Sequence, residues 1–447
     1  MEKYLRLYAE PETGQLDAAF DGRRWENVLV VPACNESPDF LRSVPPCGGR
    51  SLLILVINES AAANQEVSRA NQALADAVRH GLKLLWQSAT DAGLSLLHDP
   101  GEQRDILLVD RFSAGLQLPA GSGVGLARKI GADLAASLIY QGNIRSRWIH
   151  CSDADVELPD TYFSFSNALH DPGSNHAALV YPYRHRDDPA RAENAGVIRA
   201  TQLYELSLRY YVAGLRFAGS PYAFHTIGST MAVSATHYAK VRGFPRREAG
   251  EDFYLLNKLS KVGTVFEAAP GPDCQPIEIE ARYSDRVPFG TGAAVNRIDG
   301  LADPLGDFLY YDPQVFELLR RWLRCLPAVW QSKSSTIHAG IFADQCDLVF
   351  PGEGQRYLLA GLKAIKAQQA LEHAFRQGKS MDQFMRQVHT WFDAFRTLKL
   401  IHFLRDSHLP AIPFVKLAQH SLFRQLLALD AGLKTFHAQL RVKLELD

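Results

Sequence analysis

The sequence predicts an α/β fold, a doubly wound sheet followed by a mainly helical carboxyl-terminal extension. Continuously apolar runs at 27–33 (NVLVVPA) and 51–58 (SLLILVIN) are typical of parallel strands that are buried on both faces. The second run is followed by apolar residues at helical spacing from Val67 to Leu82. Strands that alternate with helices indicate a sheet with helices packed on both sides.

The later segments first continue this pattern and then depart from it. Asp105–Arg111 and the RWIHC run before Ser152 predict further strands, and the helix between them has an apolar face from Val124 to Leu138. From about residue 308 to the end, apolar residues recur mainly at helical spacing. We therefore predict an N-terminal extension (1–26), an α/β domain (27–307) and a mainly helical C-terminal region (308–447).

Composition and charge exclude several classes of protein. Of the 447 residues, 48 are Lys or Arg and 49 are Asp or Glu, so no overall field favours nucleic acid. The longest apolar runs are far too short to span a membrane and the amino terminus is too polar for a signal peptide, so we expect a cytoplasmic protein. Peripheral membrane contact through basic residues of the helical region stays open. The six cysteines lack C-x-x-C spacing, which predicts reduced thiols.

Two carboxylates follow one of the predicted strands directly. Asp153 and Asp155 flank a single alanine, and the carboxyl ends of parallel strands are where α/β sheets bind ligands. Two hard oxygen ligands at this spacing suit Mg²⁺ or Mn²⁺, which leave coordination positions open for a diphosphate. A solvated acidic pair explains the same residues, so the motif alone leaves both interpretations open.

A second acidic pair lies about a hundred residues further on. Glu251 and Asp252 follow Gly250 at the start of a predicted helix. Acidic residues at this position commonly complement the helix dipole and cap free amides. A carboxylate there would also serve as a general base that removes a proton from an attacking hydroxyl.

Several separated blocks, taken together, resemble glycosyltransferase family 2 over roughly residues 27–270. The family has a GT-A fold, the Rossmann-like fold of nucleotide-diphospho-sugar transferases. The matching blocks are Val30–Glu36, Val56–Ser60, Gly125–Gly131, Ser152–Asp155, Gly228–Val233, Gly243–Pro245 and Gly250–Asp252. Two positions depart from the usual family pattern: Asn58 replaces an aspartate and Lys129 replaces an asparagine.

The resemblance implies a metal-dependent, inverting transfer of a sugar from a nucleotide-sugar donor to an unidentified acceptor. UDP is the favoured nucleotide, with GDP and dTDP open. Asp252 would be the base and Glu251 its neighbour that orients the acceptor, although the reverse assignment stays open, and Asp153 and Asp155 would hold the metal. The donor contacts implied or inferred are Pro32, Ala33, Asn35, Glu36, Glu59, Arg128 and Asp153.

A Gly-rich, basic stretch after the second acidic pair is an additional candidate. Arg282–Gly292 would cover the diphosphate, with Arg286 as a phosphate contact, because guanidinium groups bind phosphate in a bidentate manner. A plain surface turn explains the same residues equally well. His225 and His338 are candidates for a third metal ligand, but a lone histidine more commonly has a structural role.

Two other functions fit parts of the sequence. A sugar nucleotidyltransferase shares the α/β core, but no Gly-rich phosphate motif follows the first strand. A noncatalytic sugar-nucleotide-binding scaffold is the other alternative, and the retained acidic residues argue against it. Processive members of the family have a Q-x-x-R-W motif; here Leu318 stands at the Gln position before Trp322, so we predict a nonprocessive enzyme.

Overall fold

The computed structural model describes residues 1–16, 20–45, 50–89, 92–102, 104–169, 174–186, 195–284, 290–337 and 353–443. The chain forms two compact units. The first contains Met1–Ala192 and Thr226–Ala293, and the second contains Glu193–His225 and Ala294–Asp447. These bounds differ from the predicted ones: the N-terminal residues are built into the first unit, and a long helix from the middle of the chain belongs to the second.

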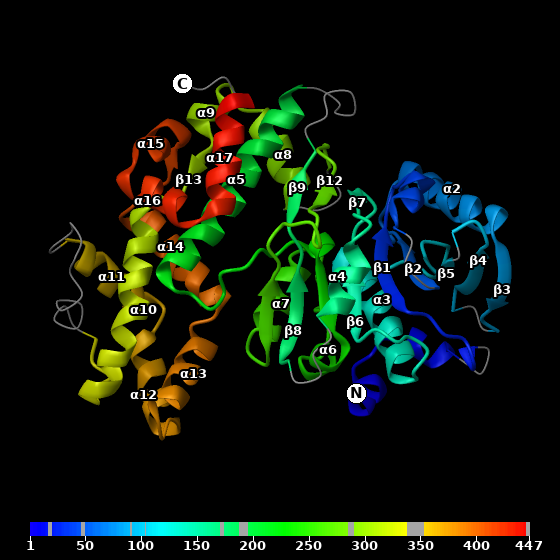
Figure 1. The fold of residues 1–447 in the computed structure, drawn as a ribbon, viewed down its shortest axis with the longest axis horizontal. Helices are drawn as coiled ribbons and strands as arrows, with labels where there is room; N and C mark the ends of the chain where they lie inside the picture. Colours follow the sequence, from blue (N-terminus) through cyan, green and yellow to red (C-terminus); the bar gives the residue numbers. More distant parts are fainter. Residues whose placement is uncertain are drawn as a thin grey trace. The chain divides into compact units, whose positions relative to one another are not determined.

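The first unit is an α/β unit built on a nine-stranded sheet in the order β11-β8-β10-β6-β1-β2-β5-β4-β3 (Figure 1). Its centre is parallel, because β1 pairs in parallel with β2 and β6, and β2 with β5. The central strands are β1 (Asn27–Ala33), β2 (Ser51–Asn58), β5 (Arg104–Arg111) and β6 (Trp148–Cys151). The strands predicted at 27–33 and 51–58 are confirmed, and every residue in both is buried.

Both edges of the sheet contain antiparallel pairs. Beyond β6, β10 (Met231–Ser234) runs antiparallel to β6 and to β8 (His176–Val180), and β11 (Thr264–Glu267) is parallel to β8. At the other edge β4 (Leu94–Asp99) and β3 (Lys83–Gln87) are each antiparallel to their neighbour. The sheet is therefore mixed and not purely parallel. A three-stranded sheet in the order β7-β12-β9 comprises β7 (Val156–Glu157), β12 (Ile277–Ile279) and β9 (Tyr183–His185).

Alternating side chains of the central strands face different helices. Leu29 and Val31 belong to one apolar cluster with Leu74 of α2 (Gln65–Gly81). The intervening Val30 faces α3 (Gly123–Tyr140), where Gly131 lies so close that an added Cβ would be 2.4 Å from a Val30 methyl group. Helices α2 and α3 therefore cover opposite faces of the sheet, as the predicted doubly wound arrangement requires.

Short helices complete the first unit. They are α1 (Glu2–Leu7), η1 (Pro11–Gln15), η3 (Pro38–Ser43), α4 (Tyr162–Ala168), η4 (Gly228–Thr230), α6 (Ala235–Lys240) and α7 (Glu251–Leu259). Tyr4 of α1 is 3% exposed and packs edge-on against Tyr238 of α6. The predicted N-terminal extension is thus part of the core of this unit.

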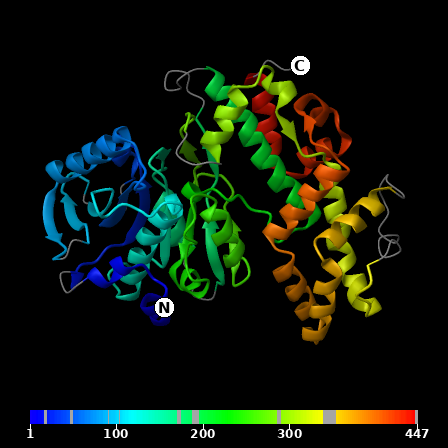
Figure 2. The same cartoon turned by 180° about the vertical axis from the view of Figure 1, so that it is seen from behind.

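The second unit is mainly helical (Figures 1 and 2). Helix α5 (Ala195–Ala218) packs against α10 (Gln314–Ser332) at Gly214, where the Phe316 ring leaves no room for a side chain. The remaining elements from residue 294 onward are most of α8 (Thr291–Asp299), α9 (Pro304–Asp307), β13 (Leu309–Tyr310), α11 (Glu353–Ala364), α12 (Ala367–Gln377), α13 (Met381–Trp391), α14 (Ala394–Ser407), β14 (Ile412–Pro413), α15 (Phe414–Gln419), α16 (Ser421–Leu429) and α17 (Ala431–Lys443). The apolar faces of α5 and α10 explain why α5 belongs here and not to the sheet. In the described parts of the chain, no helix has the length and apolarity that crossing a bilayer requires.

Candidate functional site

The candidate site lies at one edge of the central sheet. Because β1, β2 and β6 are parallel, their carboxyl ends and the polar residues that follow them share this edge. The turn after β1 is tight: Asn35 has a φ of 56°, a left-handed conformation that asparagine tolerates better than most residues. Its backbone N–H donates to Asn71 Oδ1 of α2 at 2.9 Å, which fixes the turn.

Arg128, in the first turns of α3, connects the two acidic pairs. Its Nη2 donates to Asp153 Oδ1 at 2.7 Å and its Nε donates to Glu251 Oε1 at 2.9 Å. Its Nη1 donates to the backbone carbonyls of Ser152 and Gly228, each at 3.3 Å. Burial by itself would lower the pKa of Arg128, but the ion pairs with the two carboxylates outweigh burial and raise it. The guanidinium is therefore fully charged and fixed by four partners.

Arg282 makes an equivalent connection on the other side of the D-x-D motif. Its two terminal nitrogens donate to the Glu36 carboxylate at 3.0 and 2.7 Å, and Nη2 also donates to Asp155 Oδ2 at 2.8 Å. Its Nε is buried and has no hydrogen-bond partner among the described residues. The turn after β1 and the turn after β6 are thus held together by one guanidinium.

The carboxylates of Glu251 and Asp252 have different surroundings. Glu251 is 3% exposed and is committed to Arg128. Asp252 is half-buried, and no described residue forms an ion pair with it; its Oδ1 accepts a hydrogen bond from the Phe253 N–H at 2.6 Å. Desolvation and the negative charge of Glu251 raise the pKa of Asp252 to about 7. The surroundings of Asp252 therefore favour its protonated form more than those of a solvated aspartate do.

Not every predicted donor contact points into the open edge. Glu59 is 5% exposed, and its two carboxylate oxygens accept hydrogen bonds from Ser68 and Asn71 of α2 at 3.1 and 3.3 Å. Pro32 and Ala33 are buried inside β1, and the Ala33 carbonyl accepts a hydrogen bond from the Asn58 side chain at 3.1 Å. These groups support the turn from inside the fold. By contrast, Asp153 forms an ion pair with Arg128, and Glu36 and Asp155 form ion pairs with Arg282.

Lys129 points away from the site. Its ammonium group contacts Asp133 Oδ2 at 2.6 Å, the Tyr8 carbonyl at 2.9 Å and the Tyr4 hydroxyl at 3.1 Å. All of these partners lie on α3 itself or on the N-terminal segment. Lys129 therefore stabilises the N-terminal segment and does not reach the rim of the sheet.

Three residues that sequence reasoning did not single out help to build the site. Asn71 has a signal in the sequence, since it is a polar residue on the otherwise apolar face of a predicted helix. Gly228 lies against Arg128, and a Cβ there would be 2.8 Å from the guanidinium. In the sequence Arg282 is one residue of a basic stretch, and nothing there indicates that it pairs with Glu36.

Some candidates are not part of this arrangement. Arg286 and His338 lie outside the described residues, and His225 belongs to the second unit. Cys151 is fully buried, and burial raises the pKa of its thiol to about 12, which agrees with an inert structural cysteine. Cys34, by contrast, is a half-buried free thiol at the point where the chain leaves β1 toward the rim.

The described residues contain no group of three or more His, Cys, Asp or Glu side chains that would hold a metal by themselves. Asp153 and Asp155 each use one oxygen for an arginine; the other oxygen of each accepts no hydrogen bond from the part of the chain that is described. Two carboxylates with one oxygen left over on each fit a hard divalent cation that takes its remaining ligands from phosphate and water.

Comparisons with known proteins give little further information. No protein family's sequence profile matches the chain, and no curated protein matches it. Among solved structures, the chain is similar to the mannosyltransferase PcManGT from Pyrobaculum calidifontis in complex with GDP-Man and Mn²⁺. The identity is 14%, the TM-score is 0.33, and the match covers 98% of this chain and 92% of that one. A likeness this distant does not establish a shared function, so the functional conclusion depends on the geometry of the site.

Proposed function

We propose that the first unit is a GT-A domain and that the protein is a glycosyltransferase. It transfers a sugar from a nucleotide-sugar donor to an acceptor hydroxyl, with inversion and without processive synthesis. The observation that carries the proposal is the geometry of the two acidic pairs: Arg128 pairs with both Asp153 and Glu251, and this places the half-buried Asp252 carboxylate next to the D-x-D motif.

Asp252 is the general base in this proposal. Its pKa near neutrality allows it to be deprotonated before the reaction and still basic enough to accept the proton of the attacking hydroxyl. Glu251 is less suited to this role because it is buried and engaged by Arg128 at 2.9 Å. Its negative charge instead keeps the Asp252 proton affinity high, and its ion pair fixes the start of α7.

Asp153 and Asp155 would hold Mg²⁺ or Mn²⁺ together with the donor diphosphate. When bound, the ion would neutralise the charge that develops on the departing nucleotide diphosphate. Among the described ion pairs, the guanidiniums of Arg128 and Arg282 are shared by four carboxylates, those of Glu36, Asp153, Asp155 and Glu251, and this excess of carboxylates favours a further cation.

Arg282 is the residue most suited to contact the diphosphate. It lies next to Asp155, its positive charge would attract a phosphate there, and its three hydrogen bonds to Glu36 and Asp155 leave one Nη1 hydrogen to donate. Arg128 is less available, since its three nitrogens are committed to four partners. UDP-sugars are the first donors to test, followed by GDP- and dTDP-sugars.

The first test is the thermal stability of the purified protein with Mn²⁺ or Mg²⁺ and a panel of UDP-, GDP-, dTDP- and CDP-sugars. A ligand at about a hundred times its Kd stabilises the folded state by roughly 2.7 kcal/mol. We expect one nucleotide to raise the Tm in a metal-dependent manner, an effect absent in Asp153→Ala and retained in Asp76→Ala, which removes a half-buried carboxylate of α2.

Turnover separates the proposed reaction from its alternatives. The wild type should release nucleoside diphosphate from the stabilising donor, whereas Asp252→Asn should bind the donor and release none. Pyrophosphate release from a nucleoside triphosphate and a sugar phosphate would instead identify a nucleotidyltransferase. The absence of any stabilising donor with either cation would contradict the proposed function.

A further inference from the structure

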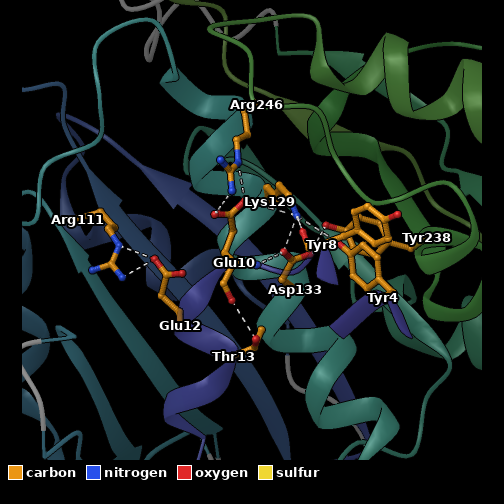
Figure 3. Close-up of polar contacts among 10 residues, drawn as sticks. All are labelled: Tyr4, Tyr8, Glu10, Glu12, Thr13, Arg111, Lys129, Asp133, Tyr238 and Arg246. Carbon is orange, nitrogen blue, oxygen red and sulfur yellow. Dashed lines mark hydrogen bonds and ion pairs between the residues drawn. The ribbon is translucent and has the colours of Figure 1, made fainter. Parts of the chain in front are cut away.

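The first sixteen residues form a polar network with α3 (Figure 3). The Tyr4 hydroxyl donates to Asp133 Oδ1 at 2.5 Å, and the Glu10 backbone N–H donates to Asp133 Oδ2 at 2.8 Å. Lys129, one helical turn before Asp133, donates to the Tyr8 carbonyl. The segment is therefore attached to the same helix that carries Arg128 into the site.

Glu10 extends this network to a second element. Its side chain is buried, and its two carboxylate oxygens accept hydrogen bonds from Nε and Nη2 of Arg246, both at 2.8 Å. Its Oε1 also lies 3.5 Å from the Lys129 ammonium group. Paired bonds between a guanidinium and a carboxylate define orientation as well as distance. Glu10 thus joins α3 to the loop at 244–250, as Figure 3 shows.

This loop leads directly into Glu251 and Asp252, and it lies against the first turn of α3. The Gly125 N–H donates to the Arg247 carbonyl at 3.0 Å. A Cβ on Gly125 would be 2.4 Å from that carbonyl oxygen, and one on Gly123 would be 2.7 Å from the Glu248 backbone. The backbone contact is close enough that a small shift of the loop would move the start of α7.

We infer that Glu10 is a positioning residue for the base. Through Arg246 it holds the loop at 244–250 against α3, so that Glu251 meets Arg128 and Asp252 is held at the rim. The inference rests on the proposed function for its catalytic consequence. The predicted N-terminal extension is then a component of the catalytic unit and not an appendage.

A purely structural role for the N-terminal segment is the competing explanation, and the chain offers a matched control. Glu12, two residues further on, is also 5% exposed and also pairs with an arginine. Its partner Arg111 lies at the end of β5, and Arg111 Nε donates to Glu12 Oε1 at 2.8 Å. Figure 3 shows the two ion pairs diverging to different elements. Loss of either pair loosens the segment, but only loss of the Glu10 pair frees the loop.

The experiment compares Glu10→Gln with Glu12→Gln in the full-length protein. Hydrogen exchange is measured on peptides covering 244–256, together with kcat and KM for the donor that the wild type uses. We expect Glu10→Gln to speed exchange in these peptides and to lower kcat by about ten- to a hundredfold at nearly unchanged donor KM, since misplacement of a catalytic group by about 1 Å costs on this order. Glu12→Gln should leave both readouts near wild type.

Equal behaviour of the two variants, in exchange and in kcat, would overturn the inference. If Glu10→Gln does not fold, Arg246→Gln tests the same ion pair from its other side. The Arg246 side chain is 60% exposed, and its replacement removes the pair with Glu10. If the wild type shows no transferase activity, the proposed function fails and exchange alone decides whether Glu10 positions the loop.

Discussion

Replacement of Arg128 by methionine provides a quantitative test of the site. Methionine fills much of the same space without charge, so the change removes the ion pairs with Asp153 and Glu251 and the two bonds to backbone carbonyls. Glu251 is 3% exposed and would be left without its partner, whereas Asp153, with a side chain that is 34% exposed, can be solvated. The main cost therefore comes from Glu251.

The size of the effect follows from distance and burial. Opposite charges 2.9 Å apart attract by roughly 6 kcal/mol at an effective dielectric constant of about 20, and the cost of desolvating both groups offsets much of this. Breaking a buried pair by removing one partner typically costs about 3–5 kcal/mol. At about 2–4 °C per kcal/mol for a unit of this size, the Tm of the first unit should fall by about 6–20 °C.

Urea unfolding followed by tryptophan fluorescence would measure the loss in the free energy of unfolding, because Trp25 and Trp148 are buried in the first unit and report on its unfolding. Arg145→Met is the control: its pair with Glu26 is exposed, at 81% and 44%, and should contribute under about 1 kcal/mol. In the double variant Arg128→Met/Glu251→Gln part of the loss should be recovered, because no unpaired buried carboxylate remains. The reasoning is refuted if Arg128→Met and Arg145→Met are equally stable.

Two further predictions concern the base and the sheet. The initial rate of transfer should rise with pH through about 7 and then level off, because Asp252 cannot accept a proton while it is itself protonated; a rate that is flat between pH 5.5 and 8.5 at saturating donor would exclude Asp252 as the base. Gly131→Ala should lower the free energy of unfolding by about 1–3 kcal/mol in urea, because the added Cβ would lie 2.4 Å from Val30. The control Gly81→Ala adds a Cβ in open space and should change the free energy of unfolding by less than about 1 kcal/mol. Equal values for the two variants would contradict the close packing of α3 on β1.

The central sheet could be predicted from the sequence because its strands are uniformly apolar. The runs 27–33 and 51–58 match β1 and β2 residue for residue. The edge strand β3 could not be found in this way: three of its five residues are exposed and the other two are half-buried, so it has neither an apolar run nor a clean alternation. The antiparallel β8 and β10 are buried, but nothing local in the sequence indicates which strand they pair with.

The site was predictable in its residue types but not in its pairings. The positions of Asp153 and Glu251 follow from short motifs at strand and helix ends, whereas their shared partner Arg128 is separated from them by 25 and 123 residues. The motif at Glu59 predicts its position at the end of β2, but it does not predict that the side chain points toward Ser68 and Asn71 of α2. Side-chain direction depends on tertiary neighbours that a single sequence does not reveal.

Lys129 shows how a departure from a motif acquires a physical meaning once its neighbours are known. Its ammonium group is buried with Asp133, which is itself fully buried, so neither charge would be tolerated alone. The same aspartate accepts hydrogen bonds from Tyr4 and from the Glu10 backbone, which only the N-terminal segment supplies. Apart from Asp133, the printed hydrogen-bond partners of Lys129 are Tyr4 and Tyr8 of the N-terminal segment, and the same segment brings Glu10 to the loop that leads to the proposed base.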